Sequence, residues 1–321
     1  MNRTTIFSLE QHARALGATG VHVLVDGHTL VDVGDTSGPV RVHSVRKSLI
    51  SALFGVAYDE GVVDLDATLG EVGIDDTPAL TEQEKAATIE DLLTARSGVY
   101  LPPLESGTSF LPPRGAYTPG THWVYNNWDF NVLGNIYERL THKSLYIAFD
   151  HHFAQPLGFT DWQPFTHSSY EYRADPMGGN LRYPNYTFFL SARDLARFGN
   201  LFVNEGISAG TRLLSEEWIA RSTRLVSATG ASNALFGGYG FLWWIAGPEQ
   251  DLRAAGIPAG TYSANGMGGN FVTILPGLRA VVAVTTGPGV EESNPDQPDN
   301  ASSAVTGYPS FVRNLVDALR S

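Results

Sequence analysis

Short apolar runs with the character of β-strands lie near both ends of the chain. They are residues 21–25, 29–33, 239–245, 271–275 and 278–285. Asp26-Gly27-His28 separates the first two runs and Pro276-Gly277 separates the last two, so each pair predicts two strands around a turn. The pattern therefore predicts a sheet to which both ends of the chain contribute.

Between these runs, apolar residues recur at helical spacing. The predicted helices are residues 8–17, 44–60, 89–95, 129–140, 192–202, 215–222 and 309–319. The second of them begins near Ser44 and ends before Gly61, a residue type that commonly terminates helices. The last has its apolar residues on one face, so we expect it to pack on the sheet.

This arrangement predicts an α+β fold with two regions. We expect residues 1–60 and 230–321 to form the sheet region, and residues 61–229 to form a mostly helical region that carries active-site loops. The loop at residues 98–120 holds five prolines. Both a wall or lid over a site and a simple surface excursion are compatible with its length.

The composition excludes several classes of function. With 43% hydrophobic residues, the 321-residue chain can bury a large core, and no internal repeat interrupts it. Its formal net charge of -12 disfavours binding to nucleic acid or to an anionic membrane surface. The absence of cysteine excludes disulfides, thiol nucleophiles and thiolate metal sites. We expect no cofactor, and the sequence leaves the oligomeric state open.

The N-terminus reads as mature protein. Glu10, His12 and Arg14 interrupt any apolar core that a signal peptide would need, and no run approaches the roughly eighteen apolar residues of a membrane helix. If Met1 is the natural start, a cytoplasmic protein is expected. A chain from which a leader had been removed would have the same appearance.

The first candidate for chemistry is a serine–lysine pair in a chain with only three lysines. Ser44 and Lys47 are three positions apart at the start of a predicted helix, so they share one face. A serine hydroxyl needs a nearby base to become a nucleophile. Lys47 can be that base when it is neutral, a form that burial among apolar side chains favours.

Two further motifs carry suitable groups. Tyr125 and Asn127 follow the Pro119-Gly120 turn, and a phenol beside an ammonium can relay a proton. The segment Asn265-Gly266-Met267-Gly268-Gly269-Asn270 precedes a predicted strand, and its glycines allow the backbone to approach a ligand. A phosphate cradle is disfavoured because we expect no strand before this segment and no helix after it.

In this order, Ser44-x-x-Lys47, Tyr125-x-Asn127 and Met267-Gly268-Gly269 resemble the motifs of the serine β-lactamase and penicillin-binding-protein superfamily. The resemblance covers essentially the whole chain and is strongest to the class C-type esterase and amidase branch. That branch includes family VIII-type carboxylesterases and 6-aminohexanoate-dimer hydrolases. The resemblance implies a β-lactamase/transpeptidase-like fold, with an antiparallel sheet flanked by helices, a mostly helical region, and the active site between them.

The resemblance also implies roles for individual residues. Ser44 would be the acylated nucleophile, Lys47 its proton partner, and Tyr125 the group that protonates the leaving group and activates water. The backbone N–H groups of Ser44 and Asn270 would form the oxyanion hole. Substrate contacts would come from Asn127, Met267, Gly268 and Gly269, with Asn127 orienting Lys47 or a substrate carbonyl.

One departure from the family pattern bears on the substrate. Family members that process penicillins or D-alanyl peptides have a lysine at the position of Met267, where it holds the substrate carboxylate. With Met267 in place of this lysine, the charge-assisted contact with the substrate carboxylate is absent. We therefore expect a serine hydrolase of carboxylic esters with weak or absent β-lactamase and D-alanyl-peptidase activity. Hydrolysis of small linear amides or peptides, acyl transfer, and a non-catalytic binding module remain alternatives.

Other candidates are weaker. Gly206-Ile207-Ser208-Ala209-Gly210 matches the nucleophile elbow of α/β-hydrolases, but a predicted helix precedes Ser208 and none follows directly. The nine histidines form no metal-binding spacing, which disfavours metal catalysis. Four tryptophans are candidates for the walls of an acyl pocket: Trp123, Trp128, Trp243 and Trp244. Burial of these side chains in the core is an equal expectation.

Overall fold

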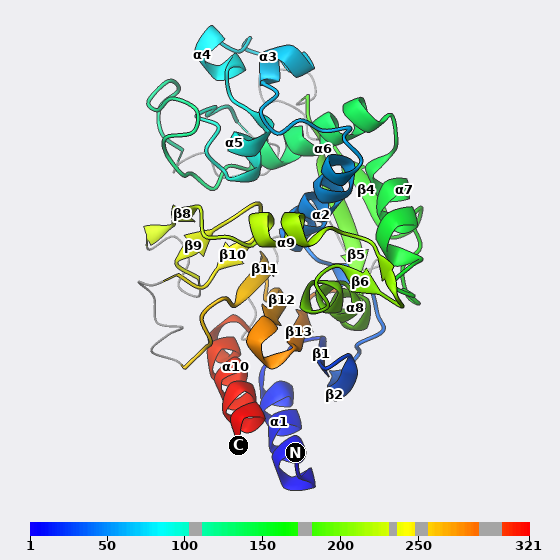
Figure 1. The fold of residues 1–321 in the computed structure, drawn as a ribbon. Coiled ribbons are helices and arrows are strands. Elements are labelled where there is room, and N and C mark those ends of the chain that lie inside the picture. The colour runs from blue at the N-terminus through cyan, green and yellow to red at the C-terminus, as the bar shows by residue number, and fades with distance from the viewer. Residues whose placement is uncertain (103–110, 173–181, 231–235, 248–255, 289–303) are drawn as a thin grey trace.

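A computed structural model of the chain describes residues 1–102, 111–172, 182–230, 236–247, 256–288 and 304–321 (Figure 1). The helices are α1 (Arg3–Ala15), α2 (Val45–Asp59), α3 (Leu69–Val72), α4 (Glu82–Lys85), α5 (Ile89–Leu93), α6 (Asn127–Thr141), α7 (Leu145–Phe149), α8 (Ala192–Val203), α9 (Glu216–Ser222) and α10 (Ala304–Arg320). The strands are β1 (Gly20–Val25), β2 (His28–Gly34), β3 (Val40–Arg41), β4 (Ser168–Glu171), β5 (Asn185–Leu190), β6 (Ile207–Ser208), β7 (Thr211–Arg212), β8 (Ser227–Ala228), β9 (Gly238–Tyr239), β10 (Trp244–Ile245), β11 (Tyr262–Gly266), β12 (Asn270–Leu275) and β13 (Ala280–Thr285).

The two ends of the chain build one sheet, as the sequence predicts. Within the described residues, eight strands pair antiparallel in the order β2-β1-β13-β12-β11-β10-β9-β8. N-terminal strand β1 lies beside C-terminal strand β13, with Val23 opposite Val282. The fold is therefore α+β, with an antiparallel sheet and helices on both of its faces.

Helices α8 and α10 cover opposite faces of the sheet. A Cβ on Gly199 of α8 would lie 2.6 Å from Val281, so the glycine permits close packing on that face. On the other face, Tyr308 of α10 stacks on Phe271 with ring centroids 4.1 Å apart and donates a hydrogen bond to Thr273. Because successive strand residues face opposite sides, strands covered in this way are buried along their whole length. The C-terminal helix packs on the sheet as predicted.

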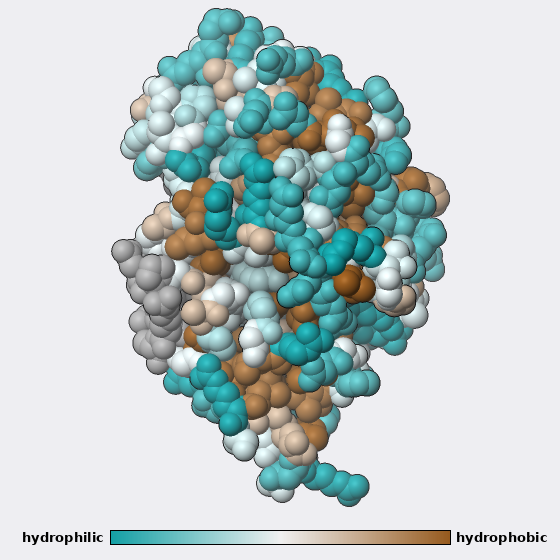
Figure 2. All heavy atoms as spheres, viewed as in Figure 1, coloured by the Kyte–Doolittle hydropathy of each residue, from teal (hydrophilic) through white to brown (hydrophobic). Residues whose placement is uncertain are grey.

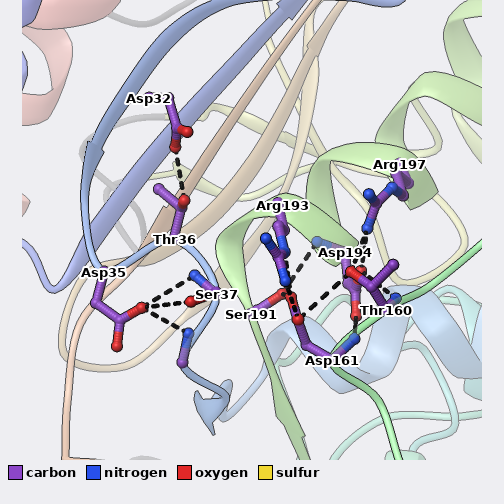
Figure 3. A network of polar contacts seen from close by, with 11 residues as sticks. Asp32, Asp35, Thr36, Ser37, Thr160, Asp161, Ser191, Arg193, Asp194 and Arg197 are labelled. Carbon is purple, nitrogen blue, oxygen red and sulfur yellow. Dashed lines mark hydrogen bonds and ion pairs between the residues drawn. The ribbon is translucent and has the colours of Figure 1, made fainter.

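A polar network fixes the start of α8 (Figure 3). Ser191 caps the helix by accepting a hydrogen bond from the Asp194 backbone N–H, and its hydroxyl donates to Asp161 at 2.6 Å. The Asp194 carboxylate in turn accepts from the backbone N–H groups of Thr160 and Asp161. Arg193 neutralises Asp161 through two guanidinium nitrogens. The loop that precedes β4 is thereby tied to the helix that covers the sheet.

Helix α2 is the central element. Residues 45–57 are all buried, in agreement with a helix that is enclosed on every side. It contacts β11 and β12 of the sheet on one side and α6 and α7 on the other, and Figure 1 shows it between the sheet and the group α3–α6. A second, three-stranded sheet has the order β3-β5-β4. Its strand β3 ends at Arg41, shortly before α2 begins at Val45, so this sheet positions the start of α2.

Several details of the predicted elements are wrong. The single strand predicted at 239–245 is instead the end of β9 and the whole of β10, because the chain reverses between them at Leu242, whose φ is 61°. Strand β11 leads into the glycine segment, where none was expected, since its small and polar residues hide the pattern. The fully buried β5 was also missed, in a region that reads as helical.

Other boundaries moved by a few residues. Helix α1 begins at Arg3, five residues early, because Asn2 caps it through the Thr5 N–H. Helix α5 ends at Leu93, and α6 begins at Asn127. The division into a sheet region and a helical region stays a prediction, and α8, which falls in the predicted helical range, packs on the sheet. The proposed lid at 98–120 lies partly outside the described residues, at 103–110.

The surface is mixed in character (Figure 2). Hydrophilic residues cover much of the upper part of this face, over α3 and α4, and apolar residues reach the surface lower down, around α1 and α10. Among the described helices, none has the length and apolarity that crossing a membrane requires.

Candidate active site

The serine and lysine of the first motif meet at the start of α2. Ser44 occupies the N-cap position, but its side chain makes no capping hydrogen bond. Its Oγ instead accepts a hydrogen bond of 2.6 Å from Lys47 Nζ. Lys47 itself is 3% exposed, so its amine is presented to Ser44 and not to solvent.

Tyr125 completes a three-group cluster with this pair. Lys47 Nζ donates to Tyr125 Oη at 2.8 Å, so the amine bridges the serine and tyrosine oxygens. The same nitrogen lies 4.7 Å from the centre of the Tyr125 ring and 4.9 Å from that of Phe130. The structure thus brings together three side chains from positions 44, 47 and 125 of the chain.

Aromatic packing holds the Tyr125 ring in place. Trp244 stacks on it at a centroid distance of 5.4 Å and an interplanar angle of 21°. Phe130 and Tyr239 contact it edge-on at 5.0 and 6.1 Å. Burial raises the pKa of Tyr239 well above its usual value, so this neighbouring phenol stays protonated.

A buried polar cluster fixes the segment that contains Tyr125. Asp129 accepts hydrogen bonds from Ser97 Oγ at 2.6 Å and from Asn126 Nδ2 at 3.0 Å. The same Asn126 amide donates to the Val99 carbonyl, and its Oδ1 caps α6 through the Trp128 N–H. Burial raises the pKa of Asp129 well above its ordinary value. The sequence reading missed this cluster, for which the only signal was the proximity of Asn126 and Asp129 to Tyr125.

Asn127 lies at the first position of α6, directly after this segment. Its Oδ1 is buried and has no hydrogen-bond partner among the described residues. A buried carbonyl oxygen in this state costs free energy unless a donor arrives with a ligand or with water. Asn127 is therefore placed near Tyr125 with an unused acceptor.

The glycine segment forms the turn between β11 and β12. A Cβ on Gly266 would lie 2.3 Å from the Val42 carbonyl oxygen, so only glycine lets β11 approach the chain just before Ser44. Gly268 and Gly269 both have positive φ, at 79° and 99°. Met267, between Gly266 and Gly268, is 61% exposed. The turn brings the start of β12 towards the N-terminus of α2.

Asn270 anchors this turn through its side chain. Its Nδ2 donates to the Met267 and Thr286 carbonyls, and its Oδ1 accepts from the Thr286 N–H at 3.0 Å. The side chain is therefore structural, and only the backbone N–H of Asn270 remains a candidate for the oxyanion hole. The N–H of Ser44, the other candidate, lies at the positive end of the 15-residue helix α2.

A cleft of about 670 Å³ opens above Ser44. The described residues that line it are Ser44, Pro112, His122, Trp123, Val124, Tyr125, Trp244, Asn265, Gly266 and Met267. Two surface cavities elsewhere, a larger one of about 1250 Å³ and a smaller one of about 350 Å³, contain none of Ser44, Lys47 or Tyr125. The sequence did not single out Pro112, His122 or Asn265 as site residues, although Pro112 lies in the loop at 98–120 and Asn265 begins the glycine segment.

The four tryptophans proposed for an acyl pocket divide into two pairs. Trp123 and Trp244 line the cleft. Trp128 is buried and donates to Asp76 at 2.7 Å, and Trp243 packs against the ring of Phe202 at 4.8 Å. The second pair therefore belongs to the core.

Ser208, the rival serine, has no hydrogen bond to a base among the described residues. Ser208 ends the two-residue strand β6, which follows α8, and in the described part of the chain its side chain makes one hydrogen bond, a 3.5 Å contact with the Pro156 carbonyl. The next helix, α9, begins at Glu216 with Ser215 as its cap. The strand–serine–helix geometry of an elbow is absent at this position.

The chain is similar to a known protein family and to several solved structures. A family model described as "Beta-lactamase" matches residues 6–306. A family VIII carboxylesterase has 17% sequence identity and a TM-score of 0.68, with 99% of this chain and 96% of the other covered. A penicillin-binding-protein homologue from Caulobacter crescentus has 15% identity and a TM-score of 0.69, covering 98% and 97%.

A third structure, from Bacillus anthracis and assigned as a 6-aminohexanoate-dimer hydrolase, has 18% identity and a TM-score of 0.64, covering 96% of this chain and 82% of the other. At such identities the structural likeness concerns the fold.

Proposed function

The chain belongs to the β-lactamase family, and from that premise we propose that it is a serine hydrolase of carboxylic esters that acts through an acyl-enzyme on Ser44. One observation carries the proposal. Lys47 Nζ lies within hydrogen-bond distance of both Ser44 Oγ and Tyr125 Oη, at 2.6 and 2.8 Å. A nucleophile is thereby connected to two groups that can accept and return its proton.

Acylation uses this connection. Ser44 Oγ attacks the ester carbonyl carbon while its proton passes to the Lys47–Tyr125 pair. The bond between the carbonyl carbon and the alcohol oxygen then breaks, and Tyr125 delivers the proton to the departing alcohol. Because Lys47 is buried beneath both oxygens, it can serve as proton partner without contacting the substrate.

The oxyanion of the tetrahedral intermediate requires fixed donors. We assign this role to the backbone N–H groups of Ser44 and Asn270, which lie at the start of α2 and at the start of β12. The α2 dipole adds favourable potential at the Ser44 N–H. The hydrogen bonds of the Asn270 side chain hold this part of β12 in position.

Deacylation reverses the roles. A water molecule takes the position that the alcohol has left, and Tyr125 accepts its proton as the water attacks the acyl carbon. Ser44 then leaves and regains its proton through Lys47. Asn127, with its unused Oδ1, is proposed to orient a donor of the substrate or of this water.

Met267 supports an uncharged substrate. It stands at the exposed edge of the cleft, and none of the described lining residues is Asp, Glu, Lys or Arg. A substrate carboxylate would therefore leave water without a counter-charge, which costs free energy. Esters without a carboxylate fit this lining better than penicillins do.

Amide hydrolysis is the second candidate, supported by the likeness in fold to the protein assigned as a 6-aminohexanoate-dimer hydrolase. Esters and amides would share the Ser44 acyl-enzyme and differ in the leaving group. Transfer of the acyl group to an alcohol or amine would differ only in the attacking molecule.

A substrate panel tests the proposal. p-Nitrophenyl esters of graded acyl length, nitrocefin and short linear amides are assayed with the wild-type protein, Ser44→Ala and the matched control Ser208→Ala. We expect ester hydrolysis that falls at least about 10³-fold in Ser44→Ala and is unchanged in Ser208→Ala. Ester turnover that survives in Ser44→Ala would overturn the proposal, and turnover of amides alone would replace it with the second candidate.

A further inference from the structure

The wall of the cleft beside Tyr125 is a continuous aromatic surface. Trp244 stacks on Tyr125, and Trp123 meets Trp244 edge-on at 6.1 Å. Tyr239 closes the group from behind, with centroid distances of 5.7 Å to Trp123 and 5.0 Å to Trp244. Each ring is held by at least two others, so the wall is formed before any ligand binds.

The lining chemistry selects a neutral apolar group. Besides the aromatic wall, Pro112, Val124 and Met267 contribute apolar surface. Among the described lining residues, only His122 and Tyr125 have ionisable side chains. Aromatic rings bind flat or edge-on against such a surface with an attraction beyond simple burial. The cleft volume of about 670 Å³ is in the range of small-molecule sites and accommodates an added ring.

The position of the wall decides which half of the ester it contacts. In the proposed reaction, Tyr125 protonates the alcohol oxygen, so that oxygen must lie within hydrogen-bond distance of Tyr125 Oη. The substituent on this oxygen therefore begins beside Tyr125. Trp244 stacks on Tyr125, and Trp123, two positions earlier in the chain, lines the same cleft, so the substituent lies beside both tryptophans. The acyl substituent leaves the carbonyl carbon in a different direction.

Building on the proposed function, we infer that Trp123 and Trp244 form a leaving-group subsite that recognises the alcohol half of the substrate, and that the preferred substrates are esters of aromatic alcohols. The step is ordinary acylation. A bond forms between Ser44 Oγ and the acyl carbon, the bond from that carbon to the alcohol oxygen breaks, and the proton lost by Ser44 ends on the released alcohol.

Two isomeric esters separate the halves of the substrate. Benzyl acetate carries its ring on the alcohol, methyl phenylacetate carries it on the acyl group, and methyl acetate carries none. Benzyl alcohol and methanol are similarly poor leaving groups, so a difference between their acetates reports binding. We expect kcat/KM for benzyl acetate to exceed that of both other esters by about tenfold or more.

The two acetates also share one intermediate. Both form the same acetyl-enzyme, so under conditions where deacylation limits turnover their kcat values coincide. The preference then appears in KM and in kcat/KM alone, which distinguishes recognition of the alcohol from an effect on the acyl-enzyme.

Variants locate the subsite. Trp123→Ala should bring the kcat/KM ratio of benzyl to methyl acetate to within about threefold of one, and Trp123→Phe should restore part of it. Trp162→Phe, a matched change at a buried tryptophan outside the cleft, should leave the ratio unchanged. Because a ratio cancels the concentration of folded enzyme, partial unfolding of a variant cannot imitate the result.

The outcomes are distinct. Preference for methyl phenylacetate, or similar kcat/KM values for all three esters, would overturn this inference and leave the proposed function standing. A ratio unaffected by Trp123→Ala would also overturn it. If no ester is hydrolysed, the proposed function fails and the subsite with it.

Discussion

Removal of one hydroxyl group, in Tyr125→Phe, separates the chemistry of the site from its packing. The Tyr125 ring is held by Trp244, Phe130 and Tyr239, and these contacts do not involve its oxygen. The hydroxyl makes a 2.8 Å hydrogen bond with Lys47. We therefore expect the ring to stay in place in the variant and the proton path to the leaving group to be lost.

The magnitude follows from general acid–base catalysis. Loss of a positioned proton donor lowers kcat/KM by about 10²–10⁴-fold, equivalent to about 2.7–5.4 kcal/mol of transition-state stabilisation. The free energy of unfolding should fall by only about 1 kcal/mol, the usual value of one hydrogen bond. A large loss of activity with a small loss of stability is the expected signature.

The assay combines ester kinetics with thermal unfolding of the same preparations. Tyr100→Phe is the matched control, because the Tyr100 hydroxyl is buried, has no hydrogen-bond partner in the part of the chain that the structure describes, and does not line the cleft. This control should retain both activity and stability. A kcat/KM of Tyr125→Phe within about tenfold of wild type, or an equal loss in Tyr100→Phe, would contradict the role of Tyr125 as proton donor.

Three further predictions concern other parts of the molecule. Burial raises the pKa of Asp129 well above its ordinary 3.8, so the folded state keeps a proton that the unfolded chain releases, and stability falls as pH rises from that value through the raised pKa. Asp129→Asn should remove this slope and be more stable than wild type at neutral pH; parallel curves of Tm against pH would contradict the assignment. Met267→Lys, at an exposed position, should raise nitrocefin turnover by about tenfold or more through a new contact with the substrate carboxylate. Turnover of a p-nitrophenyl ester is the reference, and no gain would contradict the idea that the chain lacks only this lysine to bind the carboxylate. Gly55→Ala places a Cβ 2.4 Å from Trp218 and should destabilise by about 1–3 kcal/mol in chemical denaturation, whereas Gly277→Ala, with open space around it, should be neutral; equal effects would show that packing at α2 is looser than described.

The elements that were predictable are those with a strong local pattern. The hairpin β1–β2 and the strands β12 and β13 have runs rich in apolar, β-branched residues around glycine turns, and the sheet that joins both ends of the chain followed from them. The fold and the family were likewise predictable, because the motifs around Ser44, Tyr125 and Met267 occur in a fixed order along the chain. The family match over residues 6–306 confirms that resemblance.

The elements that were missed lack such a pattern or depend on distant contacts. Strand β11 reads Tyr-Ser-Ala-Asn-Gly and becomes a strand through pairing with β10 and β12 on either side. The reversal at Leu242 is held by two long-range hydrogen bonds, one from its N–H to Leu93 and one to its carbonyl from Ser48. Neither partner is identifiable from the local sequence.

The candidate site divides in the same way. Ser44 and Lys47 were predicted to meet because helical geometry alone brings positions i and i+3 together. The stacking of Trp244 on Tyr125 was not predictable, since it depends on how β10 pairs with its neighbours. Trp123 and Trp128 look equivalent in sequence, and only the start of α6 at Asn127 places one in the cleft and the other in the core.

Trapping the nucleophile tests directly whether Ser44 is the residue that is acylated. The protein is treated with a fluorophosphonate, and the site of labelling is mapped by mass spectrometry of the digested protein in wild type, Ser44→Ala and Ser208→Ala. We expect one label per chain on Ser44, retained in Ser208→Ala and lost in Ser44→Ala. Labelling of Ser208, or of any residue in Ser44→Ala to the same extent as in wild type, would contradict this expectation.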